Sequence, residues 1–361
     1  MLPFRIGLCL FCLASRSTGQ SESADSLKSI TYNRYELSID GGYGVFLAHR
    51  NIMRQLVTGH PYQFSIKAGK RSENDIFHYP VQGIKASFYQ NYSKERIGFA
   101  LALMPYIDFP LSSGNEKWIL GVSCGIGIIQ KPFNQQKNHK NIAVGSLLNG
   151  AVNFDMRRNF SHRLGNCYVG LNLVHFSNSA FQSPNLGLNF LTINAGFTLQ
   201  KGEKKIYPDL LMVATRNFFI HRWTIMGIGS IKSIEMVYKT KVGIWGINTE
   251  YLHWLNTKSS LLAGGDLVYN NALRQTMSNY EKDLDILQFG VYGGYQLNVY
   301  RLKMLTTMGV YIRNKAEELG LFYHRLAFRY HFNRNFALQM GIRSHFAVAD
   351  FLETGLIYRI K

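Results

Sequence analysis

The stretch WILGVSCGIGI, Trp118 to Ile128, decides the fold class, because large apolar residues and small residues alternate along it with a period of two. Successive side chains of a β-strand point to opposite faces of the sheet. The pattern therefore predicts a strand with one apolar face and one face of mostly small side chains. The apolar face carries Trp118, Leu120, Val122, Cys124, Ile126 and Ile128, and the other face includes Gly121, Ser123, Gly125 and Gly127.

The same alternation recurs from residue 35 to residue 360, whereas helical periodicity is nearly absent. It defines seventeen candidate strands, many of about 9 to 13 residues, long enough to cross a bilayer obliquely. The 21 Tyr and 24 Phe residues often lie at segment ends, as in the aromatic girdles of membrane barrels. Because closure satisfies every backbone group in lipid, we expect an all-β, transmembrane antiparallel β-barrel of about 14 to 16 strands. A soluble secreted β-sandwich is the alternative fold, since its strands also alternate.

The N-terminal segment MLPFRIGLCLFCLASRSTGQ has a basic residue, an apolar core from Ile6 to Ala14 and small residues near its end. These features are typical of a secretory signal peptide. We predict a signal peptide over residues 1–20, a periplasmic lead-in over 21–32 and a single outer-membrane β-barrel over 33–361. No later apolar run reaches the roughly 18 residues of a spanning helix. The expected location is the outer membrane of a Gram-negative bacterium.

The net charge points to an anionic partner. The chain has 40 Lys and Arg against 22 Asp and Glu, a formal charge of +18. Nucleic acid is disfavoured by the export signal and the apolar stripes, so phosphorylated lipid is the preferred partner. Basic residues in the segments 135–140 and 155–163 are candidates for holding lipid phosphates.

No cofactor or metal is expected. His345, Asp350 and Glu353 cluster in sequence, but their spacing matches no zinc motif. The two cysteines beyond the predicted leader, Cys124 and Cys167, lie in apolar alternation. At such positions a cysteine behaves as a small apolar side chain, and a disulfide is also permitted in an exported protein.

A second stretch, LNLVHFSNSAFQSPNLGLNF over residues 171–190, places His175 two residues before Ser177 at the end of an alternating run. Residues i and i+2 share one face of a strand, and here that face is the apolar one. The turn-forming residues 183–187 predict a hairpin that brings Asn189 to the same outer face, near His175.

These residue types suit nucleophilic catalysis. A serine nucleophile needs a base, and the base works better when a third group fixes its tautomer. His175 fits the general base, Ser177 the nucleophile and Asn189 the orienting group. Asn178 fits a donor to the oxyanion that forms on an attacked carbonyl. An ordinary polar cluster at the rim of the sheet is the other interpretation.

The stretch HFSNSAFQSPNLGLNFLTINAGF, residues 175–197, resembles the signature of the outer-membrane lipid A 3-O-deacylase (PagL-type) family. The closing SHFAVADFLETGLIY, residues 344–358, is similar to the end of longer relatives called acyloxyacyl hydrolases. The resemblance implies a β-barrel esterase that removes an ester-linked acyl chain from lipid A, with lipopolysaccharide as its partner. It assigns the deacylase-like part to residues 33–200 and leaves additional strands over 201–361.

In this resemblance His175 and Ser177 match the histidine and serine of the family motif. Asn178 matches a residue that helps to build the oxyanion hole, and Ala180 stands where the family can use a glycine backbone amide. The family has a glutamate fourteen residues after the histidine, whereas this chain has Asn189. An amide can orient the histidine but brings no negative charge to the imidazolium. A non-catalytic outer-membrane barrel, either a pore or a lipopolysaccharide-binding protein, is therefore the alternative function.

Overall fold

The computed structural model describes residues 28–72, 77–90, 93, 95–111, 117–162, 165–208, 222–235, 240–277, 279–346 and 348–360. The predicted signal peptide lies outside these residues. Strand β1 begins at Lys28, within the segment expected as a periplasmic lead-in. Helical turns are short in the described ranges, and none of those helices could span a membrane.

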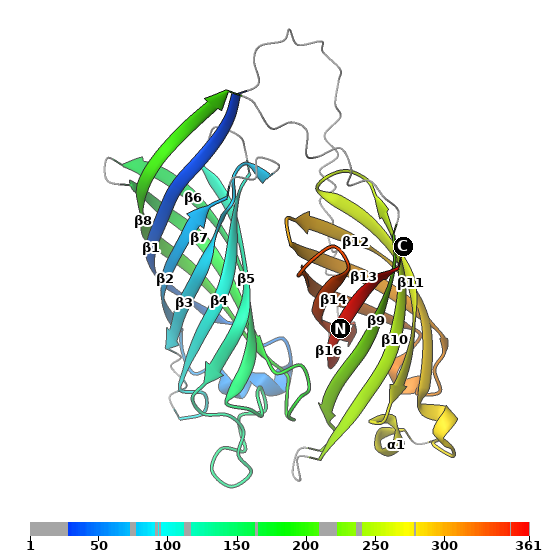
Figure 1. The fold of residues 1–361 in the computed structure, drawn as a ribbon. Helices are drawn as coiled ribbons and strands as arrows, with labels where there is room; N and C mark the ends of the chain where they lie inside the picture. Colours follow the sequence, from blue (N-terminus) through cyan, green and yellow to red (C-terminus); the bar gives the residue numbers. More distant parts are fainter. Residues whose placement is uncertain are drawn as a thin grey trace, which may run out of the picture.

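The first eight strands form one closed antiparallel barrel (Figure 1). Strands β8 and β1 close it, from Phe46 opposite Phe190 to Lys28 opposite Pro208. The strands are β1 (Lys28–Phe46), β2 (Tyr62–Arg71), β3 (Val81–Gln90), β4 (Phe99–Pro110), β5 (Trp118–Ile129), β6 (Leu148–His162), β7 (Gly165–Ser177) and β8 (Leu188–Pro208).

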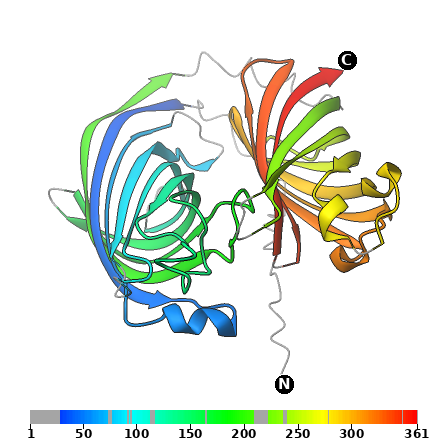
Figure 2. The same cartoon turned by 90° about the horizontal axis from the view of Figure 1, so that it is seen from below.

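The next eight strands form a second closed barrel beside the first (Figures 1 and 2). Strands β16 and β9 close it, from Thr354 opposite Gly229 to Ile360 opposite Trp223. The strands are β9 (Arg222–Ser233), β10 (Lys241–Trp254), β11 (Ser259–Asn270), β12 (Leu287–Val299), β13 (Leu302–Arg313), β14 (Phe322–His331), β15 (Phe336–His345) and β16 (Val348–Ile360). The helical turns are η1 (Asn51–Leu56), α1 (Leu273–Thr276), η3 (Asp283–Ile286) and η4 (Glu317–Leu319).

The expectation of a single barrel of 14 to 16 strands is therefore wrong, although the chain is all-β and its strands do close. Two barrels of eight strands show the same local alternation as one barrel of sixteen. The two folds differ in which strands, distant in sequence, pair to close each barrel. Local alternation of side chains does not predict that pairing. Sixteen of the seventeen candidate segments overlap the sixteen strands, and the remaining one, residues 210–218, lies outside the described residues.

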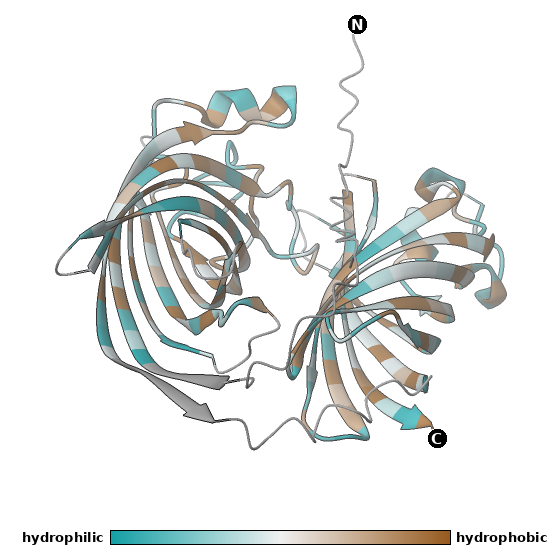
Figure 3. Cartoon of the chain, turned by 90° about the horizontal axis from the view of Figure 1, so that it is seen from above, coloured by the Kyte–Doolittle hydropathy of each residue, from teal (hydrophilic) through white to brown (hydrophobic). Residues whose placement is uncertain are grey.

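The barrel walls are apolar outside, whereas their inner faces carry both polar and apolar side chains. Brown and teal bands alternate along the strands in Figure 3. On β7 and β8 the outward side chains of Leu171 and Ile193 are 54% and 64% exposed. Inward side chains are buried, and they include polar residues as well as an apolar cluster that contains Val174, Phe176 and Phe190.

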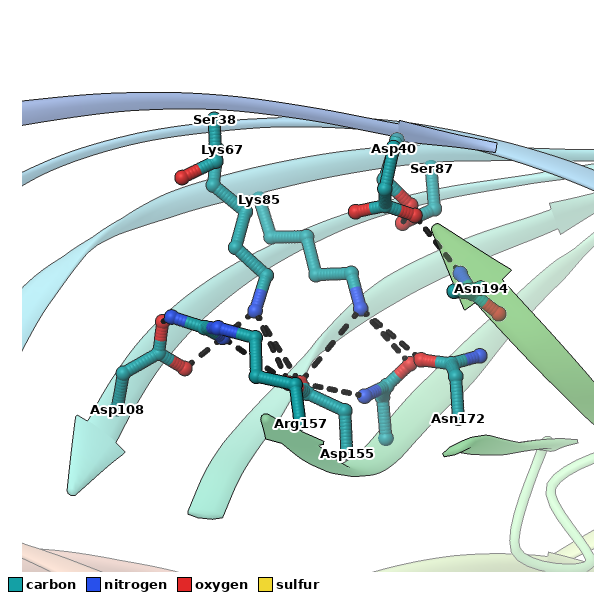
Figure 4. Close-up of polar contacts among 12 residues, drawn as sticks. Ser38, Asp40, Lys67, Lys85, Ser87, Asp108, Asp155, Arg157, Asn172 and Asn194 are labelled. Carbon is teal, nitrogen blue, oxygen red and sulfur yellow. Dashed lines mark hydrogen bonds and ion pairs between the residues drawn. The ribbon is translucent and has the colours of Figure 1, made fainter. Parts of the chain in front are cut away.

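Paired charges fill the interior of the first barrel (Figure 4). The Arg157 guanidinium lies 2.7 Å from Asp108 and 3.2 Å from Asp155. The Lys67 ammonium lies 3.4 Å from Asp108 and 3.2 Å from Asp155. The cavity left among these groups is about 10 Å³, no more than one water needs. An eight-stranded barrel has an interior that side chains can fill, and here they do.

The second barrel follows the same principle with different residues. The Arg343 guanidinium lies 2.7 Å from Asp266 and 3.2 Å from Glu353. Arg325 contacts the same two carboxylates, at 3.1 and 2.7 Å. Both arginines are buried, so each barrel neutralises its interior with its own ion pairs.

Both barrels carry their longer connections at one end, the lower end in Figure 1. In the first barrel these are residues 47–61, 130–147 and 178–187, and in the second 271–286 and 314–321. At the other end the barrels touch through an apolar cluster that includes Ile107, Phe109 and Val299. The candidate site lies at the end with the longer connections.

Candidate active site in the β7–β8 hairpin

Strands β7 and β8 place His175 directly opposite Asn189. The His175 Nδ1 atom lies 2.7 Å from Asn189 Oδ1. Because a carbonyl oxygen only accepts, Nδ1 carries the proton that His175 donates to Asn189. The other ring nitrogen, Nε2, is then free to accept a proton. This is the tautomer that a general base acting on a serine requires.

A third residue, His49, completes a hydrogen-bonded chain that the sequence analysis did not identify. The Asn189 Nδ2 group donates to His49 Nδ1 over 3.1 Å. The backbone bond from Leu47 N to Asn189 O, 2.8 Å long, holds the connection after β1 against the hairpin. Partial burial lowers the pKa of His49, and the charges of Arg50 and His175 lower it further. A neutral His49 can accept from Asn189, which turns the Asn189 carbonyl towards His175.

Ser177 is the last residue of β7, and its hydroxyl is held by Asn185. The Ser177 Oγ atom donates to Asn185 Oδ1 at 3.1 Å, and Asn185 Nδ2 lies 3.0 Å from the same oxygen. The Ser179 N–H also donates to Ser177 Oγ, over 3.1 Å. Within the described chain no hydrogen bond joins Ser177 to His175. The two side chains share one face, so a rotation of the serine about its χ1 angle is the step that would bring them together.

The turn after Ser177 has an unusual backbone. Ser179 and Ala180 have φ angles of 52° and 63°, a left-handed conformation that costs about 1–2 kcal/mol for each non-glycine residue. The Phe181 N–H donates to Asn178 O over 3.0 Å and closes the turn. The Ala180 N–H has no hydrogen-bond partner among the described residues. It is therefore a free donor close to the serine.

Asn178 is placed differently from the oxyanion donor that the sequence suggested. Its Nδ2 group donates to Ser146 Oγ and to Gln182 O, both over 2.8 Å. Its backbone N–H donates to Asn185 Oδ1 over 2.9 Å. Because these partners occupy its donors, Asn178 braces the turn in this arrangement. Of the two candidates for the oxyanion hole, Ala180 is the one whose N–H has no hydrogen-bond partner among the described residues.

Gly187 lies close to the Cε1 and Nε2 atoms of His175. Its φ angle is 78°, and a Cβ built there would lie 2.5 Å from Cε1 and 3.2 Å from Nε2 of His175. Any side chain at this position would push the imidazole away. Glycine is needed both for the backbone conformation and for the space.

A groove of about 770 Å³ lies next to the hairpin. It is connected to the site through Ser146 and Gln182, the two residues that bind Asn178. Leu148 and Phe181 in its wall are exposed and apolar, whereas Lys131 and Lys137 are cationic. The groove is lined by Glu95, Lys131, Pro132, Phe133, Asn134, Lys137, Asn138, Gly145, Ser146, Leu147, Leu148, Phe181 and Gln182.

Only one of the two basic segments lies near this groove. Lys137 of the segment 135–140 lines the groove. The described part of the segment 155–163 runs to the opposite end of β6, and Arg157 points into the barrel interior. Its assignment to lipid phosphates is wrong for Arg157, because that guanidinium is already paired with Asp108 and Asp155.

The remaining sequence candidates are not brought into the site. His345 Nδ1 lies 3.7 Å from Asp350, whose carboxylate is also paired with Lys232. Glu353 is paired with interior arginines. No group of three potential metal ligands forms within the described ranges. Cys124 and Cys167 are both free thiols.

Comparison with known proteins gives two family matches, one on each barrel. The lipid A 3-O-deacylase (PagL) family matches residues 61–198, within the first barrel. The acyloxyacyl hydrolase C-terminal domain matches residues 221–361, the second barrel. A comparison with curated proteins found no match.

Among solved structures, CdiB from Acinetobacter baumannii is 12% identical over 92% of this chain, with a TM-score of 0.19, and this chain spans 60% of it. Two mutant porins of Rhodopseudomonas blastica are 10% and 11% identical, with TM-scores of 0.19 and 0.18. Those two alignments cover 92% of this chain and 100% of each porin. Likeness at such TM-scores says nothing about fold or function. The two family matches do, because together they cover most of the chain, and the chain belongs to the lipid A 3-O-deacylase (PagL) and acyloxyacyl hydrolase family.

Proposed function

We propose that this protein is an outer-membrane esterase that removes one ester-linked acyl chain from lipid A. The observation that carries the proposal is the 2.7 Å hydrogen bond from His175 Nδ1 to Asn189 Oδ1, which leaves Nε2 as the ring nitrogen that can accept a proton. Family membership supports the reaction class and the lipid substrate.

The reaction begins when the Ser177 hydroxyl leaves Asn185 and turns to His175. Its oxygen attacks the carbonyl carbon of the acyl ester, and its proton passes to His175 Nε2. The negative charge that forms on the carbonyl oxygen is met by the free Ala180 N–H. When the intermediate collapses, the bond to the sugar oxygen breaks and His175 returns the proton to that oxygen.

A covalent acyl-serine then remains on Ser177. His175 takes a proton from a water molecule, and the water oxygen attacks the acyl carbonyl. The bond to Ser177 Oγ then breaks, His175 returns the proton to that oxygen, and the fatty acid is released. Asn189 orients the imidazole in both steps. It cannot neutralise the imidazolium as the family glutamate would, so we expect a slower reaction than with a carboxylate.

The surroundings suit a substrate that is partly apolar and partly phosphorylated. Apolar side chains such as Leu171 and Ile193 are exposed on the outer wall, where acyl chains would lie. Lys131 and Lys137 line the adjoining groove and would attract lipid phosphates. The same apolar wall on both barrels supports the outer membrane as the location.

The test is direct. The purified full chain is incubated in detergent with lipid A, and the lipid is analysed by mass spectrometry. We expect the loss of one hydroxyacyl chain and its appearance as free fatty acid, and no loss with Ser177→Ala. Unchanged lipid after long incubation with the folded wild-type chain would overturn the proposal, with circular dichroism as the check of folding.

A second candidate function is a non-catalytic protein that binds lipopolysaccharide. Two features favour it: Asn189 stands where the resemblance implies a glutamate, and Ser177 is bonded to Asn185 and not to His175. It predicts that lipid A binds without being cleaved. A pore is disfavoured, because ion pairs fill the first barrel around a cavity of about 10 Å³. Porin-like conductance steps in a planar bilayer would show that the protein does form a pore.

A further inference from the structure

The turn that follows Ser177 is held from the second barrel. Ser233, the last residue of β9, donates its backbone N–H to Ala180 O over 2.8 Å. Lys241, the first residue of β10, places its ammonium 3.6 Å from the centre of the Phe181 ring. Two successive residues of the turn are thus bound by the two ends of one β9–β10 connection.

These contacts hold a part of the first barrel whose backbone is strained. Ser179 and Ala180 both have left-handed backbone angles without being glycine, a conformation that persists only when the surroundings enforce it. The first barrel supplies the bonds to Ser177 Oγ and Asn178 O. The bond from Ser233 fixes the Ala180 carbonyl and hence the rotation of this residue about its ψ angle.

We propose that the second barrel is part of the catalytic apparatus, with Ser233 and Lys241 as positioning residues that hold Ala180 so that its free N–H can receive the oxyanion. This inference rests on the proposed esterase function. It gives the C-terminal half of the chain a role, since the first barrel closes without it.

The barrels also touch at their far end, which provides a matched control. There the Lys258 ammonium lies 5.7 Å from the centre of the Phe77 ring, next to the apolar cluster of Ile107, Phe109 and Val299. Lys241→Met and Lys258→Met each remove one cation–π contact between the barrels. Only the first of these contacts touches the turn after Ser177.

The main experiment uses two variants of Ser233 in the full chain. Ser233→Pro removes the N–H that binds Ala180, whereas Ser233→Ala keeps it and loses only the hydroxyl bond to Glu235 O. We expect kcat on lipid A to fall at least about tenfold in Ser233→Pro, with KM unchanged, because an oxyanion contact acts mainly in the transition state. Ser233→Ala should behave as wild type.

The lysine variants give a second measurement. Lys241→Met should lower kcat several-fold with KM unchanged, and Lys258→Met should not change either constant. Equal effects of the two lysine variants, or a full wild-type kcat in a folded Ser233→Pro chain, would overturn the proposal.

Amide hydrogen exchange separates this inference from the function on which it rests. Exchange of residues 178–187 should be faster in Ser233→Pro and Lys241→Met than in wild type, Ser233→Ala and Lys258→Met. If the wild type cleaves no lipid but this difference appears, the esterase function fails and the support of the turn stands. If the wild type cleaves lipid A but the variants do not change amide exchange of residues 178–187, the proposal that the second barrel supports the turn is wrong, and the esterase function stands.

Discussion

His175 and Asn189 face each other across β7 and β8, with Nδ1 and Oδ1 2.7 Å apart. This places a neutral amide where the resemblance to the family implies a carboxylate. The amide fixes the tautomer of the histidine but leaves its charged form without a counter-charge. Both consequences can be measured by changing Asn189 alone.

Replacing Asn189 by Asp should raise kcat. The aspartate side chain has the same shape as asparagine, so its oxygen would stay near His175 Nδ1 and add a negative charge beside the imidazolium. We expect a gain on the order of tenfold or more in kcat. The measurement is the rate of fatty acid release from lipid A.

Asn189→Ala is the control for this change, and it should lower kcat because the imidazole loses its orienting partner. Asn189→Glu introduces the residue that the family resemblance implies but adds a methylene group, so its gain should be smaller unless the hairpin adjusts. A slower Asn189→Asp enzyme would show that the amide is the better partner here.

His49 should shape the acid side of the pH profile. Its pKa is lowered, so it is neutral near pH 7 and accepts from Asn189; below that pKa it is protonated and can no longer accept. Protonation of His175 also stops the reaction. In wild type, log kcat should therefore fall with a slope approaching about two per pH unit, and in His49→Gln with a slope of about one. The glutamine carbonyl can still accept from Asn189. Identical slopes would show that the hydrogen bond between His49 and Asn189 does not influence catalysis.

Gly187→Ala should lower activity by moving the histidine. The new Cβ would lie 2.5 Å from His175 Cε1, which forces the imidazole to shift. A displacement near 1 Å can cost on the order of 10²-fold in rate. Gly320→Ala is the matched control, because Gly320 has a similar φ of 74° and nothing within 4 Å. Both variants should lose some stability, but only Gly187→Ala should lose activity in the lipid A assay.

Local alternation was enough to predict the strands and the face that each side chain occupies. Parity and the turn over residues 183–187 also predicted that Asn189 lies near His175, and the structure pairs them directly. These inferences need only contacts within one hairpin. The catalytic roles of the two residues remain a prediction.

Features that depend on distant strand pairing could not be predicted. The two seams, β8 with β1 and β16 with β9, join residues up to 180 positions apart, as Lys28 with Pro208. His49 reaches Asn189 only because the first seam closes, and nothing in its own sequence neighbourhood indicates the contact. The engagement of Asn178 by Ser146 depends likewise on the folding of the connection before β6.

The lysines of the groove should contribute to substrate binding. Lys131 and Lys137 are exposed in the groove beside the hairpin, where they can meet lipid phosphates. The double variant Lys131→Gln/Lys137→Gln should raise KM for lipid A by roughly tenfold, with kcat little changed, because about 1.4 kcal/mol of binding is lost. Lys201→Gln is the control, since Lys201 is exposed on β8 away from the site. With dephosphorylated lipid A the double variant should match wild type; an equal defect on both lipids would contradict a phosphate contact.

Arg157 and Arg158 should differ sharply in their effect on stability, although they are neighbours on β6. Arg157 is 5% exposed inside the barrel, where it pairs with Asp108 and Asp155. Arg157→Met would leave two buried carboxylates with too few partners, so we expect the free energy of unfolding to fall by about 3–5 kcal/mol.

Arg158 lies on the outer wall over the rings of Trp118 and Phe160, and Arg158→Met should lower the free energy of unfolding by less than about 1 kcal/mol. Urea unfolding of the full chain in lipid vesicles measures both. Equal losses would show that the interior ion pairs do not stabilise the first barrel as the structure indicates.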